Sequence, residues 1–385
     1  MDFELTDEQK AFRKMAQEFA KKEIAPLVSA DEKSHRFQRG LLLKMGLLGF
    51  FGCPIPEEYG GSNSGFLSHA LITEEVARVS GSLRAAFNMQ TMGTAREIFQ
   101  YGSDEQKRKY IPKLVSAEWL GCIGITEPNA GSDVAAMEST ARREGDFYIL
   151  KGPKMWITYA TVADVGVIYA YTDRSKRHKG ISVFIVEMKS PGITTRPIEE
   201  KMGWHACPTG EILFQDVAVP EANRIGREGE GFAFLMGSLD NTRLTAAAGA
   251  VGVCQGLIDE TIRYAQEREQ FGEPIGKFQM IQEQIARMIV ETEAARLLTY
   301  RCAWQKDRGR SNTLETSMAK LYSCDVASRI SDTALQILGS YGYSGEYPVE
   351  RYLRDAKLYP ILEGSANIHK MIIAMDALGY RKANR

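Results

Sequence analysis

The chain has the length and composition of an ordinary globular protein of two or three domains. Of its 385 residues, 44% are hydrophobic and 25% are charged, as is typical of soluble folds. Its 48 basic and 49 acidic residues leave a net charge of −1, so no overall field would recruit nucleic acid or an anionic membrane. The acidic start of the chain lacks the apolar run of a signal peptide. The longest charge-free apolar stretch, residues 244–258, is too short to span a membrane.

The cysteines and histidines argue against a disulfide framework and against a metal enzyme. The six cysteines are scattered without C-x-x-C spacing, and the five histidines form no H-x-x-x-H pair. Such a pattern favours a reducing compartment, so we expect a cytoplasmic protein.

Hydrophobic spacing predicts helices over residues 4–115. Thr6 and Gln9 have the positions of a capping box, and Phe12, Phe19 and Ile24 follow with helical spacing. The proline- and glycine-rich residues 54–61 interrupt this pattern as a loop.

The pattern changes to strands over residues 119–225 and returns to helices afterwards. Four β-branched and aromatic runs at residues 147–150, 165–171, 181–186 and 210–214 predict a sheet or barrel. Helical spacing resumes from residue 230, breaks at 309–312 and predicts a long helix over 314–338. We therefore predict three domains, at residues 1–118, 119–228 and 229–385.

One acidic residue, Glu363, lies in an otherwise uncharged run, residues 361–368, just before a predicted helix. Burial would raise the pKa of such a carboxyl toward the value that a general base needs. A solvated loop carboxylate is the alternative, and from this run alone it is the favoured one.

Four further segments are candidates for ligand binding. Residues 125–133 hold hydroxyls and small residues that suit a close ligand approach, or they form an ordinary turn. In residues 154–158, Trp156 could stack on a flat ring while Thr158 donates a hydrogen bond to a nitrogen of that ring. Alternatively, Trp156 could be a core residue. Arg268 is placed to contact a phosphate group, or it is an ordinary surface residue. Residues 240–243 open the apolar helix 244–258 as an N-cap, or they face a ligand.

Taken together, these segments resemble the acyl-CoA dehydrogenase family along nearly the whole chain. The matching motifs, in chain order, are residues 56–61, Thr126-Glu127-Pro128 with 130–133, Lys154-Met155-Trp156-Ile157-Thr158, Arg268 with Gln270-Phe271-Gly272, residues 354–357, and Glu363-Gly364. The ending, residues 363–374, is similar to the anaerobic, glutaryl-CoA dehydrogenase-like branch. The resemblance implies a mainly α fold with an α-helical N-terminal domain, a central β-barrel-like domain and a C-terminal four-helix bundle, assembled as a homotetramer.

The resemblance also implies FAD and assigns residues to it. Thr126 and Thr158 would hydrogen-bond the flavin, Trp156 would pack against it, and Ser132 would lie near the flavin and the pantetheine arm. Across a subunit boundary, the pyrophosphate and adenosine would meet Arg268, Phe271, Gln279 and Gln336. Ile125, Gly339, Ser365 and Asn367 complete the expected cofactor site.

By the same resemblance, Glu363 is the base that removes the α proton of an acyl-CoA. Its backbone N–H and a flavin hydroxyl would hold the thioester carbonyl, as an oxyanion hole does. Asp240 and Arg243 match CoA-contacting positions, and Leu362 and Gly364 flank the acyl group. Electrons would pass to an electron-transferring flavoprotein. An acyl-CoA oxidase, a flavin monooxygenase-like relative and a non-catalytic acyl-CoA-binding relative are alternatives, although the last would not need Glu363.

The acyl group is predicted from three positions. Arg84 falls where glutaryl-CoA dehydrogenases hold the distal carboxylate, or it is a surface arginine on a helix. Ala85 replaces the serine of decarboxylating relatives, Leu362 replaces a common tyrosine, and Tyr159 replaces a common asparagine. Because fewer polar groups would surround a buried carboxylate, the sequence slightly favours cyclohexane-1-carboxyl-CoA. The alternatives are glutaryl-CoA without decarboxylation, or a short or branched acyl chain, and the direction of the reaction stays open.

Overall fold

A computed structural model of the chain describes residues 4–384. Its N-terminal part is helical, as predicted. The helices are α1 (Asp7–Phe19), α2 (Ala25–Ser34), α3 (Arg39–Leu47), α4 (Gly65–Ala77), α5 (Gly81–Asn88), α6 (Arg96–Tyr101) and α7 (Asp104–Val115). The predicted capping box of Thr6 and Gln9 is present at the start of α1. The predicted loop at residues 54–61 contains one short 3-10 turn, Glu57–Tyr59.

The middle of the chain forms one eight-stranded sheet, with strands β1 (Gly121–Gly124), β2 (Thr140–Glu144), β3 (Phe147–Thr158), β4 (Val165–Tyr171), β5 (Ile181–Glu187), β6 (Ile193–Pro197), β7 (Thr209–Pro220) and β8 (Arg224–Ile225). The order is β6-β7-β3-β2-β4-β5-β8, and β1 pairs in parallel with β4. All four predicted strands are confirmed, because they coincide with β3, β4, β5 and β7. The prediction missed β1, β2, β6 and β8, which are short or carry charged residues.

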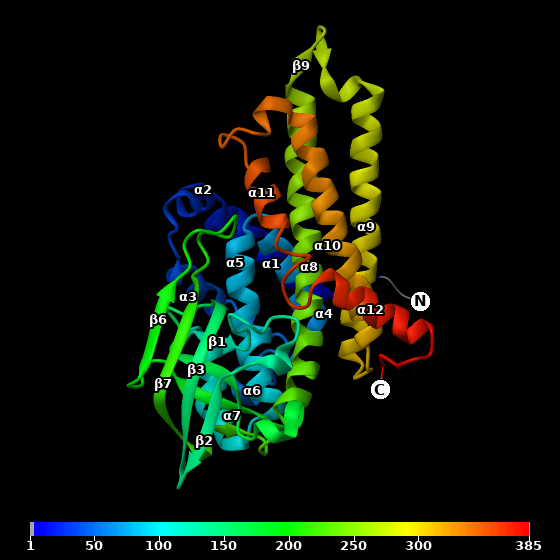
Figure 1. The fold of residues 1–385 in the computed structure, drawn as a ribbon. Coiled ribbons are helices and arrows are strands. Elements are labelled where there is room, and N and C mark those ends of the chain that lie inside the picture. The colour runs from blue at the N-terminus through cyan, green and yellow to red at the C-terminus, as the bar shows by residue number, and fades with distance from the viewer. Residues whose placement is uncertain (1–3, 385) are drawn as a thin grey trace.

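The C-terminal part is a helical bundle. Three long helices, α8 (Gly231–Glu267), α9 (Gln279–Asp307) and α10 (Thr313–Leu338), pack side by side, and the shorter α11 (Val349–Ala356) and α12 (Ala366–Ala377) pack on α10 (Figure 1). A small hairpin, β9 (Glu269–Gln270) and β10 (Glu273–Pro274), joins α8 to α9. The fold class predicted from the sequence is therefore confirmed.

One predicted helix start is wrong. Residues 240–243 do not open a helix, because α8 begins at Gly231 and already buries Leu235 and Ser238 before it reaches Asp240. The four polar residues lie inside α8, so they do not cap it. None of the helices in residues 4–384, α8 included, is long and apolar enough to cross a membrane.

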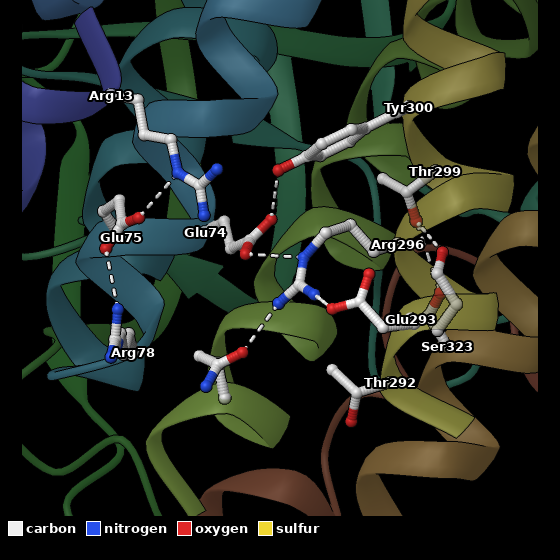
Figure 2. A network of polar contacts seen from close by, with 12 residues as sticks. Arg13, Glu74, Glu75, Arg78, Thr292, Glu293, Arg296, Thr299, Tyr300 and Ser323 are labelled. Atoms are coloured by element: carbon white, nitrogen blue, oxygen red, sulfur yellow. Dashed lines mark hydrogen bonds and ion pairs between the residues drawn. The ribbon is translucent and has the colours of Figure 1, made fainter. Parts of the chain in front are cut away.

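A buried polar network fixes the N-terminal helices to the bundle. Figure 2 shows Glu74 of α4 between two side chains of α9: Arg296 Nε lies 2.9 Å from one carboxylate oxygen, and the Tyr300 hydroxyl donates to the other at 2.7 Å. Arg13 of α1 pairs with the neighbouring Glu75 at 3.1 Å. Because α4 leads directly into α5, this network sets the position of α5 against the bundle.

Candidate active site

Glu363 lies on a turn between α11 and α12, where two successive residues have left-handed backbone conformations. Glu363 has φ +55° and Gly364 has φ +93°. Such a conformation is strained for the non-glycine residue. A side chain at residue 364 would also meet Arg243 Nη2 and His369 Nε2 at 3.2 and 3.3 Å. Glycine therefore suits this position.

The Glu363 carboxylate points into the protein. Its Oε1 accepts a hydrogen bond from Asn88 Nδ2 of α5 at 2.9 Å, and its Oε2 is shielded from solvent without a partner in residues 4–384. The Asn88 amide is oriented in turn by the Thr245 hydroxyl of α8. The alternative of a solvated loop carboxylate does not hold.

Burial raises the pKa of Glu363 to about 7, although the nearby Arg84, Lys320 and Arg243 and the hydrogen bond from Asn88 oppose this shift. Loss of water disfavours the charged form more than these groups favour it. A carboxyl group with a pKa near 7 is well matched to the removal of a proton from carbon at neutral pH.

The backbone of the turn is held through its carbonyl groups. Arg243 Nε donates to the Glu363 carbonyl at 3.1 Å, and Lys320 Nζ donates to the Gly364 carbonyl at 2.7 Å. Arg243 also pairs with Asp240 at 3.3 Å. No group in the described residues accepts from the Glu363 N–H, so this donor is available to a substrate oxygen.

Arg84 is a buried cation that has no counter-ion within residues 4–384. It is 1% exposed, and its guanidinium lies over the rings of Trp204 and Tyr359, 5.8 and 5.3 Å from their centroids. Its Nε and Nη2 have no partner in the structure's described residues. The alternative of a surface arginine is wrong. Ala85 is buried in the cluster that holds Trp204 and Tyr359, and Leu362 packs against the same cluster.

The β domain presents a second group of candidate residues. Met155 N–H donates to the Thr126 carbonyl at 2.8 Å, so the loop of Ile125 and Thr126 lies beside β3. The pairing of β3 with β7 is irregular between Lys154 and Ile157, which turns Trp156 outward with φ +62°. Trp156 is 56% exposed, so it is not a core residue.

A buried ion pair fixes this loop to the strand. Lys154 Nζ lies 2.7 Å from Glu127 Oε1, and both side chains are almost fully buried. The uncovered indole of Trp156, the half-buried hydroxyls of Thr126 and Thr158 nearby and the exposed Ser132 together suit a flat, polar-edged ring such as a flavin.

Other predicted site residues lie far from Glu363 within one chain. Arg268, Phe271 and Gln279 lie around the β9–β10 hairpin, and Gln336 and Gly339 lie near the end of α10. The hairpin is at the far end of the bundle from α12 (Figure 1). Phe271 is 96% exposed. Ser365 and Asn367, in contrast, directly follow the Glu363 turn, and Asn367 is exposed.

Four residues at the site were not predicted from the sequence: Asn88, Thr245, Lys320 and His369. Asn88 could have been found, because it lies one turn after Arg84 on α5 and shares its face. Thr245, Lys320 and His369 carry no local signal, since each reaches the site only through the packing of α8, α10 and α12.

A helical domain, a central sheet and a helical bundle that together surround a buried carboxylate define a class of proton-abstracting enzymes with a flavin site. The chain belongs to the acyl-CoA dehydrogenase family. The models of its N-terminal, middle and C-terminal domains match residues 6–118, 122–217 and 229–378. It is accordingly an FAD-dependent oxidoreductase that acts on CH–CH bonds.

Three similar proteins place the chain within the family. It is 50% identical to a glutaryl-CoA dehydrogenase of Desulfococcus multivorans over all of both chains. A solved glutaryl-coenzyme A dehydrogenase in complex with glutaryl-CoA matches with TM-score 0.98 and 50% identity, over 100% of this chain and 98% of the other. A chain from a structure of the electron-transferring flavoprotein of Acidaminococcus fermentans matches with TM-score 0.97 and 41% identity, over 98% and 100%.

Proposed function

We propose that the protein is a glutaryl-CoA dehydrogenase that forms the 2-enoyl-CoA without decarboxylation. The observation that carries this proposal is Arg84, a guanidinium with no carboxylate within ion-pair distance in residues 4–384. A buried, unpaired charge is costly, and a guanidinium matches a carboxylate with two parallel hydrogen bonds. The distal carboxylate of a glutaryl group supplies that missing partner.

In the proposed reaction, Glu363 takes the α proton from the acyl-CoA. Its N–H polarises the thioester carbonyl and stabilises the negative charge that develops on the oxygen. Asn88 keeps the carboxylate directed into the acyl pocket. FAD would supply the acceptor for the hydride that leaves the β carbon. Replacing Glu363 by Gln should leave ligand binding intact and abolish turnover, and retained turnover would refute the assignment of the base.

The cofactor would be held by residues from two parts of the assembly. We infer that Ile125, Thr126, Ser132, Trp156, Thr158, Ser365 and Asn367 face the flavin and that Arg268, Phe271, Gln279, Gln336 and Gly339 reach the pyrophosphate and adenosine of a neighbouring subunit. The exposure of Phe271 and of three apolar side chains on α9 (Met280, Val290 and Leu297) supports a homotetramer. Multi-angle light scattering of the purified protein tests this.

The absence of decarboxylation is proposed from the apolar neighbours of Arg84. Loss of CO2 would leave a carbanion that must take up a proton. Ala85 and Leu362 stand where relatives have a serine and a tyrosine and carry no such proton, so it would have to come from another group, such as the Glu363 carboxyl. An ion pair with Arg84 also stabilises the carboxylate that would have to leave. Mass spectrometry of the product tests this: the proposal expects a five-carbon enoyl-CoA, and a four-carbon product with released CO2 would overturn it.

Cyclohexane-1-carboxyl-CoA and short or branched acyl-CoAs are the alternative substrates. Ala85 and Leu362 favour an apolar acyl group, but such a group would leave Arg84 buried without a counter-ion. Anaerobic bleaching of the flavin by glutaryl-, cyclohexanecarboxyl-, butyryl- and isovaleryl-CoA separates these candidates. We expect glutaryl-CoA to bleach fastest, and faster bleaching by an uncharged acyl group would favour an alternative.

The physiological partner and compartment are proposals as well. We infer that electrons pass to an electron-transferring flavoprotein in the cytoplasm, and that Asp240 and Arg243 contact the CoA part of the substrate. Reduction of the purified electron-transferring flavoprotein in the presence of acyl-CoA tests the first point. Slow oxygen consumption by the reduced enzyme would separate a dehydrogenase from an oxidase.

A further inference from the structure

Three buried side chains from three helices hold the turn that carries Glu363. They are Arg243 of α8, Lys320 of α10 and His369 of α12, here named the turn clamp. Each is more than nine-tenths buried. Arg243 donates to the Glu363 carbonyl, and both Lys320 Nζ (2.7 Å) and His369 Nε2 (3.1 Å) bind the Gly364 carbonyl.

The side chains of Lys320 and His369 have no hydrogen-bond partner other than the Gly364 carbonyl in the described part of the chain. Lys320 has no carboxylate partner there, and its single acceptor is the Gly364 carbonyl. Burial beside two cations lowers the pKa of His369 to about 3, so its ring is neutral. The ring donates from Nε2, while its buried Nδ1 has no partner among residues 4–384. Two buried, poorly satisfied side chains that converge on one carbonyl carry a desolvation penalty, which indicates that holding this carbonyl matters.

The geometry explains what the clamp achieves. A peptide unit is planar and trans, so its N–H points away from its carbonyl. With the Glu363 carbonyl fixed on Arg243, the following N–H, that of Gly364, points to the opposite side. With the Gly364 carbonyl also fixed, the strained Glu363 residue has little freedom to relax, and its side chain stays directed at Asn88.

We propose that Lys320 and His369 are positioning residues for the reaction: they fix the Gly364 carbonyl and thereby hold the strained Glu363 residue so that its carboxylate stays aimed at the acyl-CoA. This proposal rests on the proposed role of Glu363 as the base. A displacement of about 1 Å in a reacting group lowers rates by about 100-fold, so loss of the clamp should lower the rate of proton removal more than it changes binding.

The test measures proton removal separately from hydride transfer. Carboxymethylthioacetyl-CoA has a sulfur in place of the β carbon, so it has an α proton and a distal carboxylate but no hydride to lose. Mass spectrometry follows the exchange of its α protons in D2O, catalysed by the FAD-loaded enzyme.

A matched pair of variants keeps a polar group at the position of only one of the two His369 ring nitrogens. His369→Gln places an amide at the position of Nε2, and His369→Asn places one at the position of Nδ1. We expect His369→Gln to exchange within about threefold of the parent and His369→Asn to be slower by about 10- to 100-fold, with KM changed by less than about threefold. Lys370→Met, on the exposed side of the same helix, should behave like the parent.

Lys320→Met gives an independent readout. Charged groups that act on Glu363 come from α5 (Arg84), α8 (Arg243) and α10 (Lys320), and each lowers its pKa. Lys320→Met should therefore slow exchange and also move the pH profile to higher pH, whereas His369→Asn, which removes a neutral ring, should lower the plateau without moving the midpoint.

The outcomes separate the clamp from the base. Exchange at the parental rate in Glu363→Gln would refute the proposed function itself. If Glu363→Gln shows no exchange, the role of the base stands. Parental exchange rates and parental melting temperatures in His369→Asn and Lys320→Met would then overturn the clamp alone. If Lys320→Met fails to fold, the His369 pair decides, and equal exchange rates in the Gln and Asn variants would likewise overturn the clamp.

Discussion

Replacing Arg84 by Met should lower the preference for glutaryl-CoA and raise the stability of the free protein. The side chain is 1% exposed and has no counter-ion in the described residues. With glutaryl-CoA, removing one partner of a buried charged pair costs about 2–5 kcal/mol, which corresponds to roughly 30- to 5,000-fold in kcat/KM. Butyryl-CoA has no distal charge, so its kcat/KM should change by less than about threefold when it is measured above the pKa of Glu363, which the loss of the Arg84 charge raises.

The stability of the free protein should change in the opposite direction. Without acyl-CoA, Arg84 is a buried polar group with unmade hydrogen bonds, and such groups cost about 1–3 kcal/mol each. A methionine of similar length should therefore raise the free energy of unfolding by about that amount. Stability and function are opposed at this position, as often happens at binding sites.

The assay compares kcat/KM for glutaryl-CoA and butyryl-CoA with a ferrocenium acceptor, and urea unfolding of the same samples. Arg96→Met is a matched control, because Arg96 also lies over aromatic rings, those of Phe66 and Phe99. It should not change the ratio of the two substrates. Equal losses with both substrates in Arg84→Met, or a marked drop in its stability, would refute the reasoning.

Three further predictions concern buried charges. Lys154→Met leaves the Glu127 carboxylate buried and unpaired, so it should destabilise the protein by about 3–5 kcal/mol and lower the FAD-to-protein ratio; the absorbance spectrum and urea unfolding measure both. Arg296→Met removes the cation paired with the buried Glu74 (Figure 2), so it should also destabilise the protein. A urea midpoint equal to that of the parent would contradict the role of this network. Burial raises the pKa of Glu363 to about 7 from 4.5, so the folded state holds a proton that the unfolded state releases, and stability is lost as pH rises from about 4.5 through 7. Glu363→Gln should therefore be more stable than the parent at about pH 8, by up to about 3 kcal/mol, and equal to it near pH 4.5; equal stability at both values would show that the carboxyl is not perturbed.

Local sequence patterns were sufficient for the fold and for part of the site. A lone acid in an apolar run made Glu363 a candidate, which only the resemblance to a family turned into a predicted base, and β-branched runs marked the buried strands β3, β4, β5 and β7. These signals are strong because burial acts on each residue directly. Strand β2, with the sequence Thr-Ala-Arg-Arg-Glu, is mostly exposed, so it has no such signal.

The contacts that tune the site could not be predicted in the same way. The hydrogen bond from Asn88 to Glu363 joins residues 275 positions apart, and no periodicity links them. Asp240 and Arg243 were mistaken for a helix start because Asp, Asn and Thr are typical N-cap residues. Inside α8 they act through tertiary contacts instead, since Arg243 binds both Asp240 and the Glu363 carbonyl.

The two halves of the site should separate in the kinetics. Arg84 and a distal carboxylate keep their charges while a proton moves to Glu363, so their attraction is equal in the ground state and the transition state and acts on KM. The turn clamp, in contrast, aims groups whose charge changes during the reaction, so it acts on kcat. Measured above the pKa of Glu363, Arg84→Met should raise KM for glutaryl-CoA, and His369→Asn should lower kcat. Because Arg84 reaches the acyl end and His369 reaches the backbone of the turn, with no shared hydrogen-bond partner among the described residues, the two effects should multiply in the double variant. A double variant no worse than His369→Asn alone would show that both act through one step.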